Sequence, residues 1–281
     1  QGKATATTER VNVDMMQTPG SEIGFKGEEQ LGGGLSAWFQ CASTADMRGQ
    51  SQDGWCSRNS ALGMKGGFGN FWVGNWDTPF KRVGGLNRIV NETGAFGASF
   101  LLTGGATTVN GGATPGLFSR RQNNSINYDS PNFGGFQLML STSALNTSTG
   151  NLTTTTANKP RLWSFGGTYR NGPMNFGLAY ETHKDFSPAG ANTFSGTDKA
   201  WMLSAGYQLG TLRLGAMYID RKYETSATTE LKLKSYNIAA DWKFAGPHGL
   251  RAGYTRAADT KGNYGTAAAP LTISGSGTTI I

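Results

Sequence analysis

Apolar and polar residues alternate in short runs along almost the whole chain. In the segment 201–209, every second residue is apolar: Trp201, Leu203, Ala205, Tyr207 and Leu209. The residues between them are Met202, Ser204, Gly206 and Gln208. A period of two is typical of β-strands, and the 3.6-residue period of helices is almost absent. The pattern therefore predicts an all-β, antiparallel protein.

About 13 segments carry this alternation and are predicted to be strands. They span residues 4–16, 21–29, 34–42, 57–66, 69–78, 120–130, 134–145, 161–170, 174–184, 199–209, 211–223, 231–244 and 249–258.

The connections between these strands alternate in length. They are short at 30–33, 66–70, 131–135, 171–173, 210–211 and 246–249, and long at 43–56, 79–119, 146–160, 185–198, 224–230 and from 259 on. An antiparallel meander with tight turns at one end and long loops at the other is typical of an outer-membrane β-barrel. A soluble sandwich with Greek-key connections explains this regularity less well.

In such a barrel the apolar face of each strand meets lipid and the polar face meets water. In the opening hairpin, Ile23 and Phe25 then face lipid, whereas Glu22 and Lys26 face the lumen. Aromatic residues near the ends of the strands fit the girdles that such barrels place at the membrane interfaces. These residues are Trp38, Phe39, Trp72, Tyr180, Trp201, Tyr218, Trp242 and Phe244.

The composition adds limits on function. Glycine supplies 42 of the 281 residues, about twice its average usage, which indicates many turns and small residues within strands. The formal charge of +7 is scattered along the chain, and no basic stripe with interleaved aromatics is present, so nucleic acid is not an expected partner. Apolar runs are too short for a transmembrane helix.

Cys41 and Cys56 are the two cysteines. They bracket a polar loop between predicted strands, so they are candidates for a disulfide in an oxidising compartment. The alternative is a pair of buried free thiols. Two cysteines and two distant histidines do not supply the spacing of a zinc site, and no metal or cofactor is expected.

Three segments resemble the Gram-negative general porins, especially those of betaproteobacteria. Residues 21–35, SEIGFKGEEQLGGGL, match the family's first hairpin, in which a glycine-rich turn follows an alternating strand. Residues 59–74 are similar to the next hairpin, and residues 120–136 to the strand that follows the third loop. The resemblance covers essentially the whole chain.

The resemblance implies a homotrimer of 16-stranded barrels in the outer membrane, surrounded by lipid and lipopolysaccharide and passing small hydrophilic solutes passively. It also implies that the third loop, here about 79–119, folds into the lumen; an external flap is the alternative. We expect residues 1–281 to form one barrel domain. Because single-chain bacterial barrels have an even number of strands, about three C-terminal strands are expected to be missing from the sequence.

The sequence departs from the family's pattern at several charged positions. Glu22 and Asn75 stand where the family has arginines. The third loop carries mostly bases where the family tends to place acids. The ion selectivity of the family is therefore not assumed for this chain.

We predict the following residues to line the pore or its constriction: Glu22, Lys26, Lys65, Asn75, Lys81, Arg82, Arg88, Glu92, Arg120 and Arg121. Bases outnumber acids in this set, which predicts a mild preference for anions.

Three other functions would need different features in the sequence. A substrate-specific channel for sugars or organic anions would need a path of aromatics, which Trp76 and Phe80 would begin. A structural or adhesive barrel would need no open path. An enzyme is not expected, because His183 and His248 fall at opposite predicted ends of their strands.

Overall fold

The computed structural model describes residues 21–45, 54–89, 118–144, 160–185, 196–224, 230–258, 261–266, 269–272 and 277–280. The predicted strand 4–16 and the predicted pore residue Glu92 lie outside these ranges.

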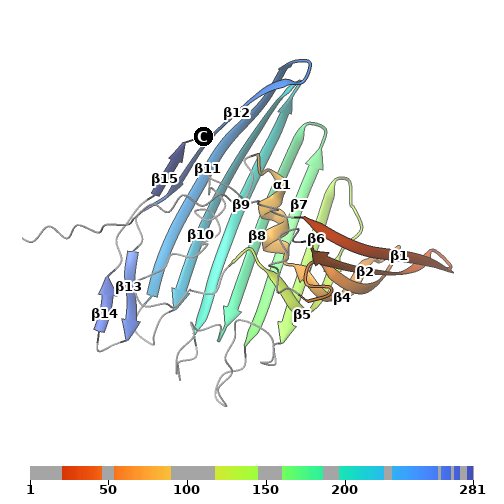
Figure 1. Cartoon of the computed structure of the whole chain (residues 1–281). Helices are drawn as coiled ribbons and strands as arrows, with labels where there is room; N and C mark the ends of the chain where they lie inside the picture. Colours follow the sequence, from red (N-terminus) through yellow and green to blue (C-terminus); the bar gives the residue numbers. More distant parts are fainter. Residues whose placement is uncertain are drawn as a thin grey trace, which may run out of the picture.

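Twelve strands follow one another in a single antiparallel sheet, in the order of the sequence (Figure 1). They are β1 (Glu22–Gly32), β2 (Leu35–Thr44), β3 (Ser60–Gly66), β4 (Gly69–Asp77), β5 (Arg121–Asp129), β6 (Phe136–Ala144), β7 (Arg161–Asn171), β8 (Met174–Lys184), β9 (Thr197–Leu209), β10 (Leu212–Glu224), β11 (Glu230–Ala245) and β12 (His248–Ala257). The meander predicted from residue 21 to residue 258 is confirmed, with strand ends shifted by up to three residues.

Tight turns join the strands at one end of the sheet. The turns after β7 and β9 each contain a glycine with positive φ, Gly172 at 53° and Gly210 at 56°. Only glycine adopts this backbone conformation without a steric cost. The long connections lie at the other end, so the two ends of the sheet differ as the sequence predicted.

The polarity of the sheet is reversed relative to that of a soluble protein. On β9, the Leu203 side chain is 48% exposed on the outer face, while the neighbouring Ser204 is 3% exposed on the inner face. The same contrast recurs in β8, where Leu178 is exposed and Glu181 is buried. The outer face therefore presents a continuous apolar surface, as a lipid-facing barrel wall does.

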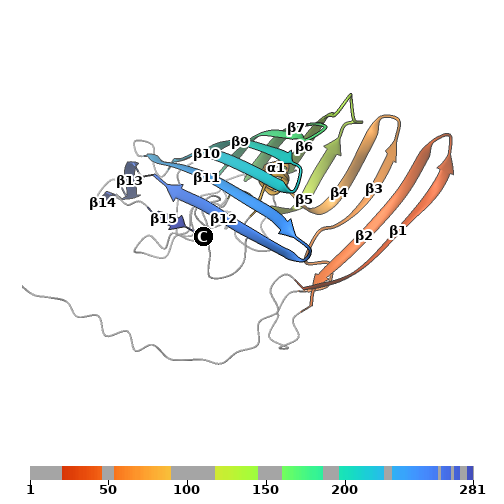
Figure 2. The same ribbon diagram turned by 90° about the horizontal axis from the view of Figure 1, so that it is seen from above.

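Figure 2 shows that the sheet is curved, with its one described helix on the concave side. This helix, α1 (Pro79–Leu86), follows β4 directly. The Thr78 side chain caps it by accepting a hydrogen bond from the Lys81 backbone N–H, and Pro79 opens its first turn. No helix was predicted here from the sequence. No helix among the described residues is long and apolar enough to cross a membrane.

The segment from 259 on, predicted to be a loop, contains three short strands. They are β13 (Lys261–Thr266), β14 (Ala269–Thr272) and β15 (Gly277–Ile280). β15 pairs with the outer edge of β12, and β13 pairs with β11 and β14. The prediction was wrong because it treated the Gly- and Thr-rich composition as loop, although β-branched Thr and Ile favour strands.

Candidate functional site

A track of glycines on the inner face of β7–β10 receives α1 and the residues after it. A methyl group at Gly206 would lie 2.0 Å from the Asn87 side-chain oxygen, and one at Gly215 would lie 2.5 Å from the Asn87 backbone oxygen. At Gly177 the nearest contact would be Val83, at 2.8 Å. Side chains at these positions would therefore occupy the space in which α1 and Asn87 lie. The glycines thus form a groove, defined here as Gly166, Gly177, Gly206 and Gly215.

Apolar side chains fix α1 in this groove. Phe80 and Val83 are fully buried, and the Phe80 ring lies 5.8 Å from that of Phe118. Phe118 in turn stacks on His183 of β8 at 4.4 Å. Both described ends of the connection 79–119 therefore lie against the inner face. Residues 90–117 are outside the described part of the chain.

A charged cluster surrounds the start of the helix. The Asp77 carboxylate accepts a hydrogen bond from Lys81 Nζ at 2.9 Å and lies 3.2 Å from Arg121 Nε. Arg121 Nε also donates to the Asn59 side chain at 2.6 Å. One carboxylate, that of Asp77, is therefore shared by two of the predicted pore bases.

Arg82 extends from α1 to β5. Its guanidinium donates two hydrogen bonds to the Asp129 carboxylate, at 2.8 and 2.5 Å. The same group lies 5.7 Å from the ring centre of Trp72 on β4. A bidentate pair of this kind fixes orientation as well as distance, so Arg82 holds the helix against two neighbouring strands.

On β1, two acids meet bases of the neighbouring segments. Glu22 accepts a hydrogen bond from Arg58 at 2.5 Å, and Glu28 accepts one from Lys65 of β3 at 2.6 Å. Lys26 lies between these two acids along the strand and forms no hydrogen bond or ion pair with any described residue. It is the one predicted pore base in β1–β4 with an exposed, unpaired charge among the residues that the structure describes.

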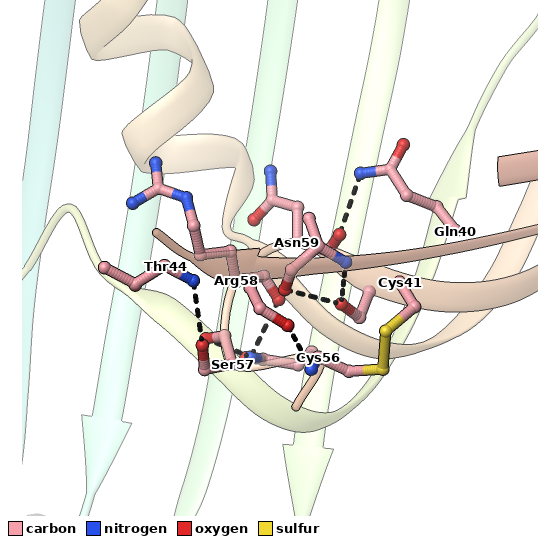
Figure 3. The surroundings of a disulfide bond; sticks show 11 residues. Gln40, Cys41, Thr44, Cys56, Ser57, Arg58 and Asn59 are labelled. Atoms are coloured by element: carbon pink, nitrogen blue, oxygen red, sulfur yellow. Dashed lines mark hydrogen bonds between the residues drawn. A yellow bond between two sulfur atoms is a disulfide. The ribbon is translucent and has the colours of Figure 1, made fainter. Parts of the chain in front are cut away.

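Cys41 of β2 and Cys56 are joined by a disulfide across 15 residues (Figure 3). The segment after Cys56 is held in place by further bonds. Asn75, predicted to line the pore, donates to the backbone oxygens of Ser57 and Arg58 at 3.0 Å. In the structure its amide therefore supports this segment, which presents Arg58 to Glu22.

Arg88 and Arg120 lie at the two ends of the third connection and are partly buried. Burial lowers the pKa of both guanidinium groups, and the Glu181 carboxylate opposes this effect at Arg120. Arginine remains protonated at neutral pH despite such shifts. Both groups thus contribute positive charge next to the helix.

The structure corrects the predicted positions of several aromatics. Trp38 and Trp72 were predicted to lie in the outer girdle, but both are on the inner face, where Trp38 bonds to Asn70 and Trp72 is 2% exposed. The alternation of side chains along a strand explains the error. Trp38 directly precedes Phe39, which points outward, so Trp38 must point inward. Phe80, predicted to begin an aromatic path, lies on the buried side of α1 and is not exposed to the lumen.

Sequence reasoning missed four charged residues of the inner face: Glu28, Arg58, Asp77 and Asp129. Glu28 shares the alternation of Glu22 and Lys26 and was recognisable from it. Arg58, Asp77 and Asp129 are recognised only in the structure, from their ion pairs with residues of other segments. In this part of the chain the bases are Lys26, Arg58, Lys65, Lys81, Arg82 and Arg121, and the acids are Glu22, Glu28, Asp77 and Asp129.

Six bases against four acids leave an excess of two positive charges on this part of the inner face. Charges on a low-dielectric wall focus their field into the water that they enclose. The arrangement can therefore favour anions along a polar path without any covalent chemistry. Among the described residues no cluster has the composition of a metal site.

A family model described as Gram-negative porin matches residues 1–276. The curated relatives include the major outer membrane protein P.IB of Neisseria meningitidis serogroup A, 32% identical over 59% of this chain and 44% of the relative. The same protein of Neisseria gonorrhoeae is 38% identical over 42% of this chain and 30% of the relative. The chain thus spans less than half the length of these relatives.

Solved structures show the same fold. An anion-selective porin from Comamonas acidovorans superposes with a TM-score of 0.68 at 22% identity, covering 86% of this chain and 71% of that one. A loop-deletion mutant of an outer membrane protein of Vibrio cholerae gives a TM-score of 0.67 at 15% identity, with 93% and 78% coverage.

Proposed function

Because the chain belongs to the Gram-negative porin family, we propose that it forms a water-filled channel for the passive diffusion of small hydrophilic solutes across the outer membrane. The observation that supports this most directly is the reversed polarity of the sheet. Leu203 is exposed on the outer face, while Ser204 is buried on the inner face. The apolar outer face suits contact with lipid, and the polar inner face suits contact with water.

The channel would be one closed barrel domain that includes residues 1–281. β1 has a single strand neighbour among the described residues, β2. In lipid, an unpaired edge leaves backbone N–H and C=O groups unsatisfied. Further strands would therefore complete the barrel, and the family resemblance puts the total at 16.

The channel would prefer anions mildly. The excess of two positive charges counted on the inner face of β1–β5 and α1, together with Arg88, supports this sign. The charge of Arg120 is opposed by the Glu181 carboxylate and adds little to the excess. The solved neighbour from Comamonas acidovorans is described as anion-selective. Because most of the bases are paired with acids, the preference would be modest and would decrease as salt screens the field.

The protein would assemble as a homotrimer within outer-membrane lipid and lipopolysaccharide, as the family resemblance implies. Its third connection would narrow the lumen, because the segment 79–89 lies along the inner wall and not outside it. The groove glycines lack side chains and so leave the space in which this segment packs against the wall.

Liposome swelling tests the diffusion function. Liposomes that contain the folded protein are mixed with isotonic neutral solutes of increasing size, from glycerol to a trisaccharide. The proposal expects swelling that slows smoothly with solute size, as through a water-filled pore. Absence of swelling with every solute, from protein shown to be folded, would exclude it.

A further inference from the structure

Three tryptophans gather on the inner face of β2 and β4. The ring centres of Trp38 and Trp72 are 6.1 Å apart, and Trp76 lies 5.8 Å from Trp38 and 5.6 Å from Trp72. Tilted and edge-to-face pairs at these distances are favourable. A general diffusion path does not require such a cluster.

Trp38 is the member of the cluster that lies on β2. Its indole occupies the space in front of Gly63 on β3, where a methyl group would lie 2.4 Å from the ring. Its N–H donates to Asn70 Oδ1 at 2.8 Å, which fixes the ring in its plane. Because β3 covers one side of the ring and the side chain is only half-buried, the opposite side is turned toward the lumen.

A pocket of about 440 Å³ adjoins this ring. Its lining comes from Lys26, Gly27 and Glu28 of β1, from Trp38, Phe39 and Gln40 of β2, and from Lys65 and Asn70. Two lysines and one glutamate give it a net charge of +1.

The charges of this pocket are not equivalent. Lys65 is paired with Glu28 at 2.6 Å, so these two offset one another. Lys26 has no partner among the described residues. The Asn70 amide accepts from Trp38 through its oxygen, and its NH₂ group forms no bond within the described part of the chain. The pocket therefore offers one ammonium group and one amide donor beside an aromatic surface.

We propose that this pocket is a binding subsite for planar aromatic carboxylates on their way through the channel. The ring of the solute stacks on Trp38, its carboxylate pairs with Lys26 Nζ, and the Asn70 amide donates a second hydrogen bond. This inference rests on the proposed channel function and deepens it. The unpaired ammonium favours an anion over a neutral sugar, although both can stack on an aromatic ring.

The probe is a pair of carboxylates with equal charge and similar size, benzoate and cyclohexanecarboxylate. Only benzoate is planar and aromatic. The chloride current through the protein in a planar bilayer is first measured in KCl, and each carboxylate is then added in increasing concentration. We expect benzoate to reduce the current at a concentration about fivefold lower than cyclohexanecarboxylate, in line with the free energy of an aromatic pair.

Two variants separate the contributions of the ring and of the charge. Trp38→Leu should remove the difference between the two carboxylates. Lys26→Gln should weaken both about fivefold while keeping the difference, as for a partly exposed ion pair. The matched controls are Trp163→Leu, at a ring on the outer face that is 48% exposed, and Lys184→Gln, at the loop end of β8. Both controls should behave as wild type.

If Trp38→Leu does not fold, the Lys26→Gln variant still tests the subsite. It is expected to fold, because Lys26 is exposed and supports no other described residue. Equal action of benzoate and cyclohexanecarboxylate on the wild-type current would overturn the subsite, as would block by maltose without block by benzoate. A channel that conducts KCl but shows neither effect refutes the subsite alone. Absence of any KCl current from folded protein refutes the channel itself.

Discussion

Arg82 of α1 and Asp129 of β5 form a bidentate ion pair between segments that are 47 residues apart. The pair lies at 28% and 11% side-chain exposure, so it is only partly screened by water. Together with the groove glycines of β7–β10, it holds the helix on two sides. α1 is therefore fixed against the inner face of the sheet, and in the proposed channel it would narrow the lumen from there.

Arg82→Gln and Asp129→Asn should shift ion selectivity in opposite directions. Loss of the arginine removes a positive charge from the lumen, and loss of the aspartate removes a negative one. The reversal potential in a KCl gradient should move toward cations for Arg82→Gln and toward anions for Asp129→Asn. Shifts of the same sign would show that both variants act by loosening the helix and not through charge. Lys184→Gln serves as the control outside the lumen.

Gly166→Leu should displace α1, whereas Gly167→Leu should not. A methyl group at Gly166 would lie 2.9 Å from Met139 and 3.1 Å from Pro79, while one at Gly167 on the outer face would meet nothing closer than 3.8 Å. Overpacking of this kind costs about 1–3 kcal/mol. The thermal unfolding temperature and the single-channel conductance should both change for Gly166→Leu alone. Equal unfolding temperatures and conductances for the two variants would contradict the packing of α1 against Gly166.

Reduction of the Cys41–Cys56 disulfide should destabilise the barrel. The bond closes a loop with a sequence separation of 15, for which the chain-entropy estimate is about 3 kcal/mol. Urea unfolding in detergent, with and without dithiothreitol, measures this difference. The double variant Cys41→Ser, Cys56→Ser should resemble the reduced protein and show no response to dithiothreitol. An identical midpoint for oxidised and reduced wild type would refute the prediction.

Phe39→Lys and Gln40→Lys, at adjacent positions of β2, test which face meets lipid. Phe39 is 47% exposed on the outer face and lies midway along β2 rather than at its end, so it is not at the girdle position predicted for it. A lysine facing the middle of a bilayer costs about 2–4 kcal/mol. Gln40 faces inward, so a lysine there should leave folding into liposomes intact and increase anion preference. The opposite ranking of folding efficiency would mean that the faces are assigned wrongly.

The sheet was predictable because its signal is local. The contrast between Leu203 and Ser204 requires only the period of two, and the glycine turns at Gly172 and Gly210 mark the strand ends. Strand pairs joined by tight turns then follow without knowledge of the rest of the chain.

The helix and the ion pairs were harder to predict. α1 spans only Pro79–Leu86 and includes Gly84 and Gly85, so helical periodicity is too short to detect. The Thr78–Pro79 start was a usable signal, since a capping residue followed by proline marks a helix N-terminus. The pairing of Asp129 with Arg82 depends on how the third connection folds back, which no local pattern encodes.

The most direct test of the proposed channel is the current through the protein in a planar bilayer with a KCl gradient across it. An open, mildly anion-selective trimer should show stepwise conductance, closing steps in groups of three and a reversal potential of the sign for anion preference. A folded protein that conducts no ions would contradict the open channel.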